Sequence, residues 1–189
     1  MNYVYLKAVL IAAVGCYLFW PESDEEAIER EAIERPALRK RSVRPIESKS
    51  NHINIALNLI KKYEGFSDVP YRCAAGVLTI GYGETDPAIV SRGYISKEDA
   101  HNLLREKIVM ISKDVDKKVY PDLTAHQRAA LISFYYNLGG DNFKNIASRI
   151  NKGNIEEASD AILLYDKCKG RTLKGLKIRR QEEQYLFTL

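Results

Sequence analysis

Residues 63–84 read YEGFSDVPYRCAAGVLTIGYGE, and this stretch decides the fold because it joins the end of a helix to a small hairpin. Apolar side chains recur at helical spacing over residues 54–63, which predicts a helix that ends near Glu64. Gly65 follows at once, where a helix C-terminus commonly takes a residue with positive φ. Turn-forming residues come next, and residues 76–83 then form a short β-branched strand bounded by glycines. The pattern therefore predicts a carboxylate at a helix end that faces a hairpin.

Two further side chains stand at fixed distances along the chain from Glu64. Eight residues separate Glu64 from Cys73, and five separate Cys73 from Thr79. Taken by itself, a glutamate beside a helix-ending glycine is usually a solvated end residue. A functional interpretation of Glu64 therefore depends on what the rest of the chain contains.

The spacing of Glu64, Cys73 and Thr79 resembles the active-site pattern of phage-type lysozymes, the endolysins that cut bacterial cell-wall glycan. Three segments carry the resemblance in the right order: residues 63–84, residues 127–139, which look like the central helix of that family, and residues 176–183, which look like its last helix. The resemblance covers residues 50–189. It implies an α+β, lysozyme-like fold that is mostly helical and carries a small β-hairpin lobe.

The same resemblance implies a role for each of the three side chains. Hydrolysis of a glycosidic bond needs a protonated acid for the leaving oxygen and a group on the other face of the sugar. Glu64 is the expected general acid, and Thr79 is expected to hold a water through its hydroxyl. Many relatives carry Asp at the position of Cys73, although some carry Cys. A thiol is a weaker base and acceptor than a carboxylate, so Cys73 is a departure that leaves the general base and the stereochemical outcome open.

The function implied is hydrolysis of the β-1,4 bond between N-acetylmuramic acid and N-acetylglucosamine in peptidoglycan, leading to host-cell lysis. Peptidoglycan glycan strands are the expected partner, and a monomer is the expected state. A lytic transglycosylase needs the same acid but no bound water, which Thr79 slightly disfavours. A non-catalytic wall-binding module would have no need of Glu64 and Thr79, and an anchored scaffold without wall activity is a further alternative.

Charge is unevenly distributed along the chain. Residues 1–35 hold three Lys/Arg and seven Asp/Glu, which leaves 26 basic and 18 acidic side chains, a net charge of +8, in residues 36–189. A basic body suits a polyanionic partner such as nucleic acid, anionic lipid or acidic cell wall. The sequence shows no basic patch interleaved with aromatics and no zinc-finger spacing, so we expect no nucleic-acid partner.

Cysteine and histidine usage predicts neither a metal site nor a cofactor. The chain has no Cys-x-x-Cys motif, and its three histidines have no helical or finger-like spacing. The three cysteines are instead candidates for a regulatory disulfide: Cys16, Cys73 and Cys168. Outside the inner membrane, a disulfide through Cys73 would tie up a catalytic position, with Cys168 as a candidate partner. The alternative is that Cys168 is simply buried.

In relatives of this kind, a leader cysteine frees the catalytic one. Here Cys16 would attack the bridge by thiol–disulfide exchange, and activation requires Cys16 to end paired with Cys168.

Residues 1–20 form an apolar leader with Lys7 before the run and an acidic cluster after it, which predicts a cytoplasmic N-terminus and a periplasmic body. No small residues precede a signal-peptidase cut, and the surroundings of Cys16 are a poor lipoprotein signal. A weak uncleaved anchor fits better, because the run is short and diluted by alanines and a glycine. It resembles the signal-arrest-release segment of one branch of these endolysins, which is held at the inner membrane and later released to the periplasm.

Three segments are therefore expected: a signal anchor over 1–20, a charged tether over 21–50 and a catalytic domain over 51–189. Within the domain, apolar periodicity and capping residues predict four further helices and a loop. The expected helices lie at about residues 97–118, 124–136, 142–151 and 154–165, with a loop at 169–175 and a closing helix at 176–187.

Overall fold

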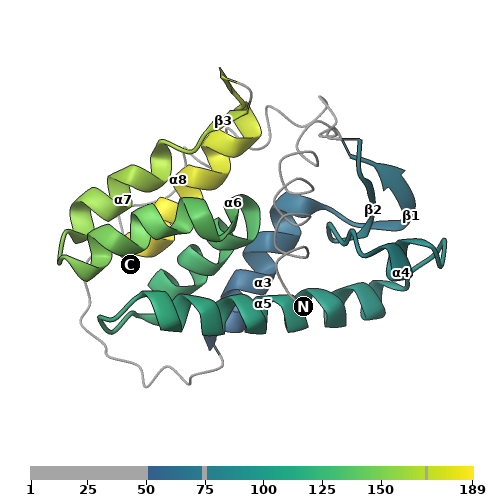
Figure 1. The fold of residues 1–189 in the computed structure, drawn as a ribbon, viewed down its shortest axis with the longest axis horizontal. Coiled ribbons are helices and arrows are strands. Elements are labelled where there is room, and N and C mark those ends of the chain that lie inside the picture. The colour runs from purple at the N-terminus through teal and green to yellow at the C-terminus, as the bar shows by residue number, and fades with distance from the viewer. Residues whose placement is uncertain (1–50, 74–75, 169) are drawn as a thin grey trace, which may run out of the picture.

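A computed structural model of the chain describes residues 51–73, 76–168 and 170–189 (Figure 1). The expected anchor and tether, with Cys16, lie outside these residues. No helix in the described part of the chain combines the length and the apolar character that crossing a membrane requires.

The described chain is mainly helical, with two small antiparallel hairpins. In chain order the elements are α3 (Asn51–Glu64), β1 (Ser67–Arg72), β2 (Leu78–Gly81), α4 (Pro87–Val90), α5 (Lys97–Lys118), α6 (Ala125–Asn151), α7 (Ile155–Leu163), β3 (Lys167–Cys168), β4 (Arg171–Thr172) and α8 (Lys174–Thr188). α6 contacts α3, α5, α7 and α8, so it is the central element of the core. Every residue of α6 from Ala129 to Asn137 is buried.

Local capping signals explain where two of the long helices start. The Ser96 hydroxyl accepts from the backbone N–H of Asp99 at 3.0 Å at the start of α5. Thr124 and Gln127 form the reciprocal capping box at the start of α6. Both starts were predicted from the sequence, and both are confirmed.

The molecule has two lobes joined by α5, which runs along one side of the structure in Figure 1. The hairpin lobe consists of β1, β2 and α4, and the helical lobe consists of α6, α7 and α8. In the first hairpin, Tyr71 pairs with Thr79 and Arg72 pairs with Leu78, while the register is irregular between Ser67 and Tyr71. The backbone N–H of Ile95 donates to the Asp68 carbonyl at 2.9 Å, so the segment before α5 lies against β1.

Three boundaries differ from the sequence predictions. The break expected between the helices at 124–136 and 142–151 is present as a kink at Gly139, with φ 76° and ψ 174°, but helix resumes directly after it, before residue 142. The loop expected at 169–175 is wrong as stated, because β3 and β4 pair there and α8 already begins at Lys174. The expected strand at 76–83 is shorter, since only Leu78–Gly81 has strand geometry. Short elements like these are fixed by pairing with a neighbour, which local propensity does not reveal.

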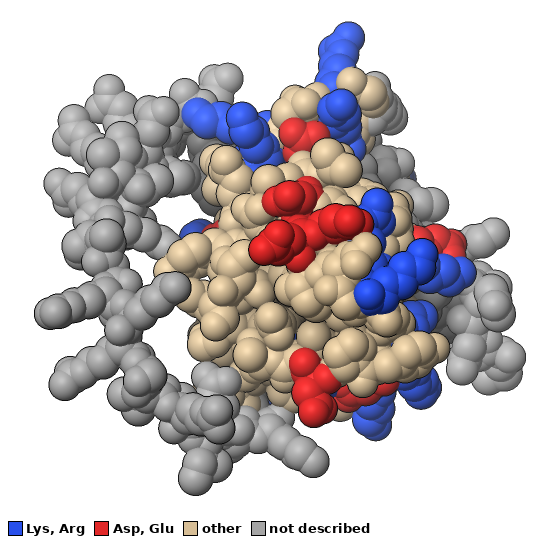
Figure 2. All heavy atoms as spheres, turned by 90° about the vertical axis from the view of Figure 1, so that its left-hand side faces the viewer, with Lys and Arg blue, Asp and Glu red and all other residues tan. Residues whose placement is uncertain are grey.

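Figure 2 shows the end of the helical lobe, with acidic and basic side chains in separate small groups on one surface. The positive net charge of the body therefore does not appear as a uniformly basic surface on this face.

Candidate active site

Glu64 is the last residue of α3, and its side chain is buried, with only 1% of its surface exposed. Gly65 ends the helix with φ 66°, as the sequence predicted. Oε1 of Glu64 accepts from Nη1 of Arg179 at 2.8 Å. Oε2 is buried without a hydrogen-bond partner among the described residues. Glu64 is therefore not the solvated helix-end residue that its local sequence also allowed.

Arg179 connects Glu64 to a second buried carboxylate. Its Nε donates to Oε1 of Glu183 at 3.0 Å, and its Nη2 donates to the carbonyl and hydroxyl oxygens of Ser133 at 3.3 and 3.2 Å. Arg180 donates to the same Glu183 oxygen at 2.8 Å. These five residues, Glu64, Ser133, Arg179, Arg180 and Glu183, form what we call the acid cluster. Two arginines balance two carboxylates in it, which is the condition under which buried charge is tolerated.

Burial raises the pKa of Glu64 above its usual range. The positive charge of Arg179 and its hydrogen bond oppose this shift, and the charges of Lys107 and Arg180 oppose it more weakly. The cost of desolvating the carboxylate outweighs these opposing effects. Glu64 therefore keeps its proton to a higher pH than a solvated glutamate, which is what a general acid requires.

Cys73 and Thr79 lie in the first hairpin, on either side of its turn. Thr79 is fully buried on β2, and its hydroxyl donates to the Val77 carbonyl at 3.1 Å. Cys73 is 5% exposed, and its backbone N–H donates to the same Val77 carbonyl at 3.0 Å. In the described part of the chain, no hydrogen bond joins Glu64 to either side chain. The structure thus buries all three predicted residues, the acid at the end of α3 and the other two in the hairpin that follows it.

The thiols of Cys73 and Cys168 are both free, and Cys168 is half-buried. The pairing expected between them is therefore not formed in this structure, and their exchange with Cys16 stays a prediction.

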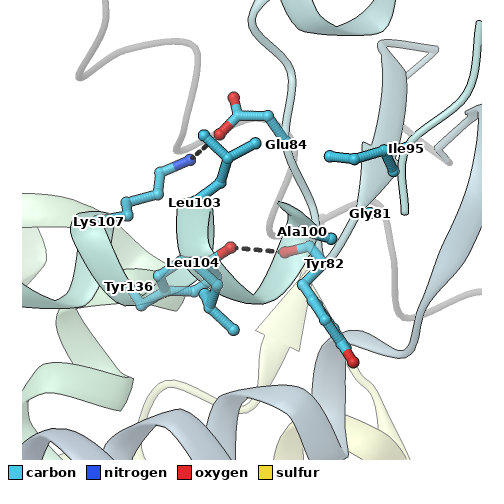
Figure 3. A pocket seen from close by; sticks show the side chains of 9 residues that line it. All are labelled: Gly81, Tyr82, Glu84, Ile95, Ala100, Leu103, Leu104, Lys107 and Tyr136. Atoms are coloured by element: carbon cyan, nitrogen blue, oxygen red, sulfur yellow. Dashed lines mark hydrogen bonds and ion pairs between the residues drawn. The ribbon is translucent and has the colours of Figure 1, made fainter. Parts of the chain in front are cut away.

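A small cavity lies where the hairpin lobe meets α5 and α6 (Figure 3). It has room for about one water molecule. On its walls, Tyr136 donates its hydroxyl to the Tyr82 carbonyl at 2.7 Å, and Nζ of Lys107 lies 3.6 Å from Oε2 of Glu84. A Cβ on Gly83 would lie 3.3 Å from the Tyr136 hydroxyl and 3.6 Å from Oε2 of Glu64, so this glycine separates the cavity wall from the acid.

Sequence reasoning missed Arg179 as a site residue, although a signal was present. The buried positions of α8 follow one helical stripe: Leu176, Arg179, Arg180, Glu183 and Phe187. Charged residues on the stripe that faces the core indicate a buried polar network rather than an ordinary apolar face. For metal binding, no group of three or more His, Cys, Asp and Glu side chains in the described chain is arranged to hold an ion.

Comparison with known proteins identifies the family. The sequence pattern of the family described as "Phage lysozyme" matches residues 61–183. The endolysin of Bacillus phage B103 is 35% identical over 135 residues, which is 69% of this chain and 51% of that protein, so the chain spans about half the length of this relative. The SAR-endolysin of bacteriophage PS119 is 31% identical over 123 residues, 64% of this chain and 74% of that protein.

Solved structures agree with the sequence relatives. The muramidase domain of SpmX from Asticaccaulis excentricus is 30% identical, with a TM-score of 0.63 over 77% of this chain and 99% of that chain. The endolysin from Escherichia coli O157:H7 phage FAHEc1 is 26% identical, with a TM-score of 0.62 over 78% of this chain and 96% of that chain. This chain belongs to the phage lysozyme family, because the family pattern matches a segment that spans Glu64 through Glu183 and its mostly helical fold is shared with these structures.

Proposed function

We propose that this protein is an endolysin that hydrolyses the β-1,4 bond between N-acetylmuramic acid and N-acetylglucosamine in peptidoglycan. The observation that carries the proposal is the buried carboxyl of Glu64, with its raised pKa, at the base of the hairpin. A carboxyl in this state can donate a proton to a leaving glycosidic oxygen.

The acid cluster determines which oxygen of Glu64 carries the proton. Oε1 accepts from Arg179, so the proton belongs on Oε2, which faces the backbone of Gly83. Gly83 has no side chain, so no Cβ stands between its backbone and Oε2, which is itself buried in this structure. After the proton leaves, the guanidinium of Arg179 stabilises the carboxylate that remains.

Catalysis requires the closed site to open. Glu64 and Thr79 are both buried, so a glycan strand reaches the acid only if the hairpin lobe moves away from the helical lobe. The Thr79 hydroxyl donates a hydrogen bond to the Val77 carbonyl, and its lone pairs remain to accept from a water that enters with the substrate. Cys73 is a weaker hydrogen-bond acceptor than a carboxylate at the same position would be. The placement of the water therefore depends more on Thr79.

The substitution Glu64→Gln tests this function. The amide keeps the size of the side chain and still accepts from Arg179, but it has no acid proton to give. We expect loss of wall clearing by about 10²–10⁴-fold, the usual contribution of general acid catalysis. Turbidity of chloroform-treated cells measures the rate, and clearing at the wild-type rate by folded Glu64→Gln would contradict the assignment.

Product analysis separates hydrolysis from the alternatives. Hydrolysis leaves reducing ends on the muramic acid residues, whereas a lytic transglycosylase leaves anhydro ends because no water enters. A wall-binding module or a scaffold would leave the glycan intact in both wild type and Glu64→Gln.

We also propose that residues 1–20 act as a weak anchor that later releases the protein to the periplasm. The support is the leader sequence, together with the similarity to proteins named SAR-endolysins. Replacing Ala12, Ala13 and Gly15 with Leu should hold the protein on the membrane and delay lysis, since about 0.8 kcal/mol accrues per buried CH₂. Fractionation and N-terminal sequencing decide the matter, because a soluble form that begins after residue 20 would mean cleavage instead.

Redox gating through Cys73 is part of the same proposal. Cys73→Asp should clear walls equally well in oxidising and reducing buffers, because it cannot form a disulfide. The wild type should be slower in the oxidising buffer until Cys16 is available for exchange. An Asp variant that is inactive in both buffers would exclude this role.

A further inference from the structure

Tyr63, directly before Glu64, contacts two residues of α8. The guanidinium carbon of Arg179 lies 5.5 Å from the centre of the Tyr63 ring, within cation–π range. The Tyr63 hydroxyl donates to Oε2 of Glu182, which also accepts from Nζ of Lys62 at 2.9 Å. The ring is buried at the end of α3, so these contacts join the end of one helix to a turn of another.

The spacing on α8 makes this double contact possible. Arg179 and Glu182 stand three residues apart, so they project from the same side of the helix toward α3. Glu182 fixes the hydroxyl end of Tyr63, and the ring then lies against the Arg179 guanidinium. The residue that precedes the acid thus contacts the arginine that binds the acid.

Arg179 has an alternative partner within the acid cluster. It already donates from Nε to Oε1 of Glu183, and Oε2 of Glu183 is buried without a hydrogen-bond partner among the described residues. A rotation of the guanidinium toward Glu183 would satisfy that oxygen in a two-bond pair and withdraw Nη1 from Glu64. A contact that disfavours this rotation keeps the guanidinium of Arg179 next to the carboxyl of Glu64.

We propose that Tyr63 and Glu182 are positioning residues that hold the Arg179 guanidinium against Glu64 and thereby set the pH at which Glu64 loses its proton. The effect on catalysis rests on the proposed function, but the effect on the Glu64 proton does not.

The direction of the effect follows from the charges that face Glu64. Arg179 and Arg180 approach it from α8, and Lys107 approaches it from α5. On α6, the uncharged Ser133 contacts Arg179, and the uncharged Tyr136 hydroxyl lies beside Gly83, as does Oε2 of Glu64. Arg179 is the strongest of the charges that favour ionisation of Glu64, so loosening it raises the pKa of Glu64 further.

The test is a ¹³C NMR titration of the Glu64 side-chain carboxyl in the full-length protein, with Tyr63→Leu as the main variant. Leucine fills much of the ring's volume but offers neither the cation–π face nor the hydroxyl. We expect the titration of Glu64 to move to higher pH by about one unit, at the lower end of the roughly 1–3 units that a close opposite charge supplies. The high-pH limb of wall clearing should move in the same direction.

Two more variants complete the experiment. Tyr63→Phe keeps the ring and loses only the Glu182 contact, so it should fold and give a smaller upward shift. Lys177→Gln is the matched control, because Lys177 is an exposed cation of α8 whose side chain contacts neither Tyr63 nor Glu182. Its Glu64 should titrate as in the wild type.

The outcomes separate the two proposals. Unchanged Glu64 titration in folded Tyr63→Leu, or in Tyr63→Phe if the leucine variant does not fold, would overturn the positioning role. A shift in Tyr63→Leu no larger than that in Lys177→Gln would also overturn it, since the effect would then not depend on the contacts of Tyr63. If the wild type itself does not cleave walls, the proposed function is refuted. The titration result for the Tyr63 variants is then unaffected.

Discussion

The residue with the largest consequence is Glu64, because its burial affects both chemistry and stability. Removing a carboxylate from water is unfavourable, and a single shared arginine offsets this only in part. The result is a carboxyl whose pKa is raised by burial despite its contact with Arg179. The stability cost thus falls at the position of the proposed proton donor.

This cost predicts a pH dependence of stability. Below the ordinary pKa of a glutamate, 4.5, Glu64 is protonated in both the folded and the unfolded chain. Above that pH the unfolded chain releases this proton first, so the free energy of unfolding falls until the pH passes the raised pKa of the folded state. Glu64→Gln lacks this dependence.

We therefore expect the stability of Glu64→Gln relative to wild type to increase as the pH rises from 4 to 7. The slope is about 1.4 kcal/mol per pH unit between the two pKa values. Urea unfolding of both proteins at several pH values measures the difference, and the other titrating groups cancel in it. Parallel stability curves for the two proteins would show that the pKa of Glu64 is not raised.

At the scale of elements, α6 shows how one residue changes the course of a helix. Gly139 has φ 76° and ψ 174°, a conformation that is almost restricted to glycine. The chain leaves helical geometry there and resumes it at once, which lets buried residues on both sides of the kink pack into the same core. The sequence predicted a break between helices at 124–136 and 142–151, and the structure has this break as a kink at one glycine.

Gly139→Ala should destabilise the protein by about 1–3 kcal/mol, because a Cβ is strained in this conformation. Gly153→Ala provides a comparison, since Gly153 has φ 82° but open space around it. Gly153→Ala should destabilise the protein by about 1 kcal/mol, because only the positive φ disfavours a side chain there. Chemical denaturation measures both variants, and an equal or smaller cost at Gly139 would contradict a special role for the kink.

On the scale of the whole molecule, polar contacts join the hairpin lobe to α5 and α6. Tyr136 on α6 donates to the Tyr82 carbonyl just after β2, and Lys107 on α5 approaches Glu84 (Figure 3). Under the proposed function, a glycan strand that enters between the lobes would change both contacts. They would then contribute to the free energy difference between this form and an open one.

Tyr136→Phe removes the hydroxyl and leaves the Tyr82 carbonyl without this donor. We expect a stability loss of about 1–3 kcal/mol and faster hydrogen exchange across residues 78–84. Tyr120→Phe is the matched control, because the Tyr120 side chain is 80% exposed. Hydrogen exchange that is unchanged in the hairpin of Tyr136→Phe would show that this bond does not hold the lobe closed.

The sequence by itself determined the local features of this protein. Gly65 after Glu64, the glycine-bounded β-branched run and the caps at Ser96 and Thr124 predicted where helices and the main hairpin lie. These features follow from backbone preferences and periodicity, which act over a few residues and can be read without a neighbour. The short pairs β3 and β4 escaped prediction because each strand is defined only by its partner.

Only the tertiary structure decided the state of the acid. Glu64 and Arg179 are 115 positions apart, and Tyr63 and Glu182 are 119 apart. No local pattern predicts such a pair, because it forms only when α3 and α8 both pack against α6. The sequence placed a carboxylate at the end of a helix, whereas packing removed it from water and gave it a buried cation. This is why its proton affinity is a property of the fold rather than of the motif.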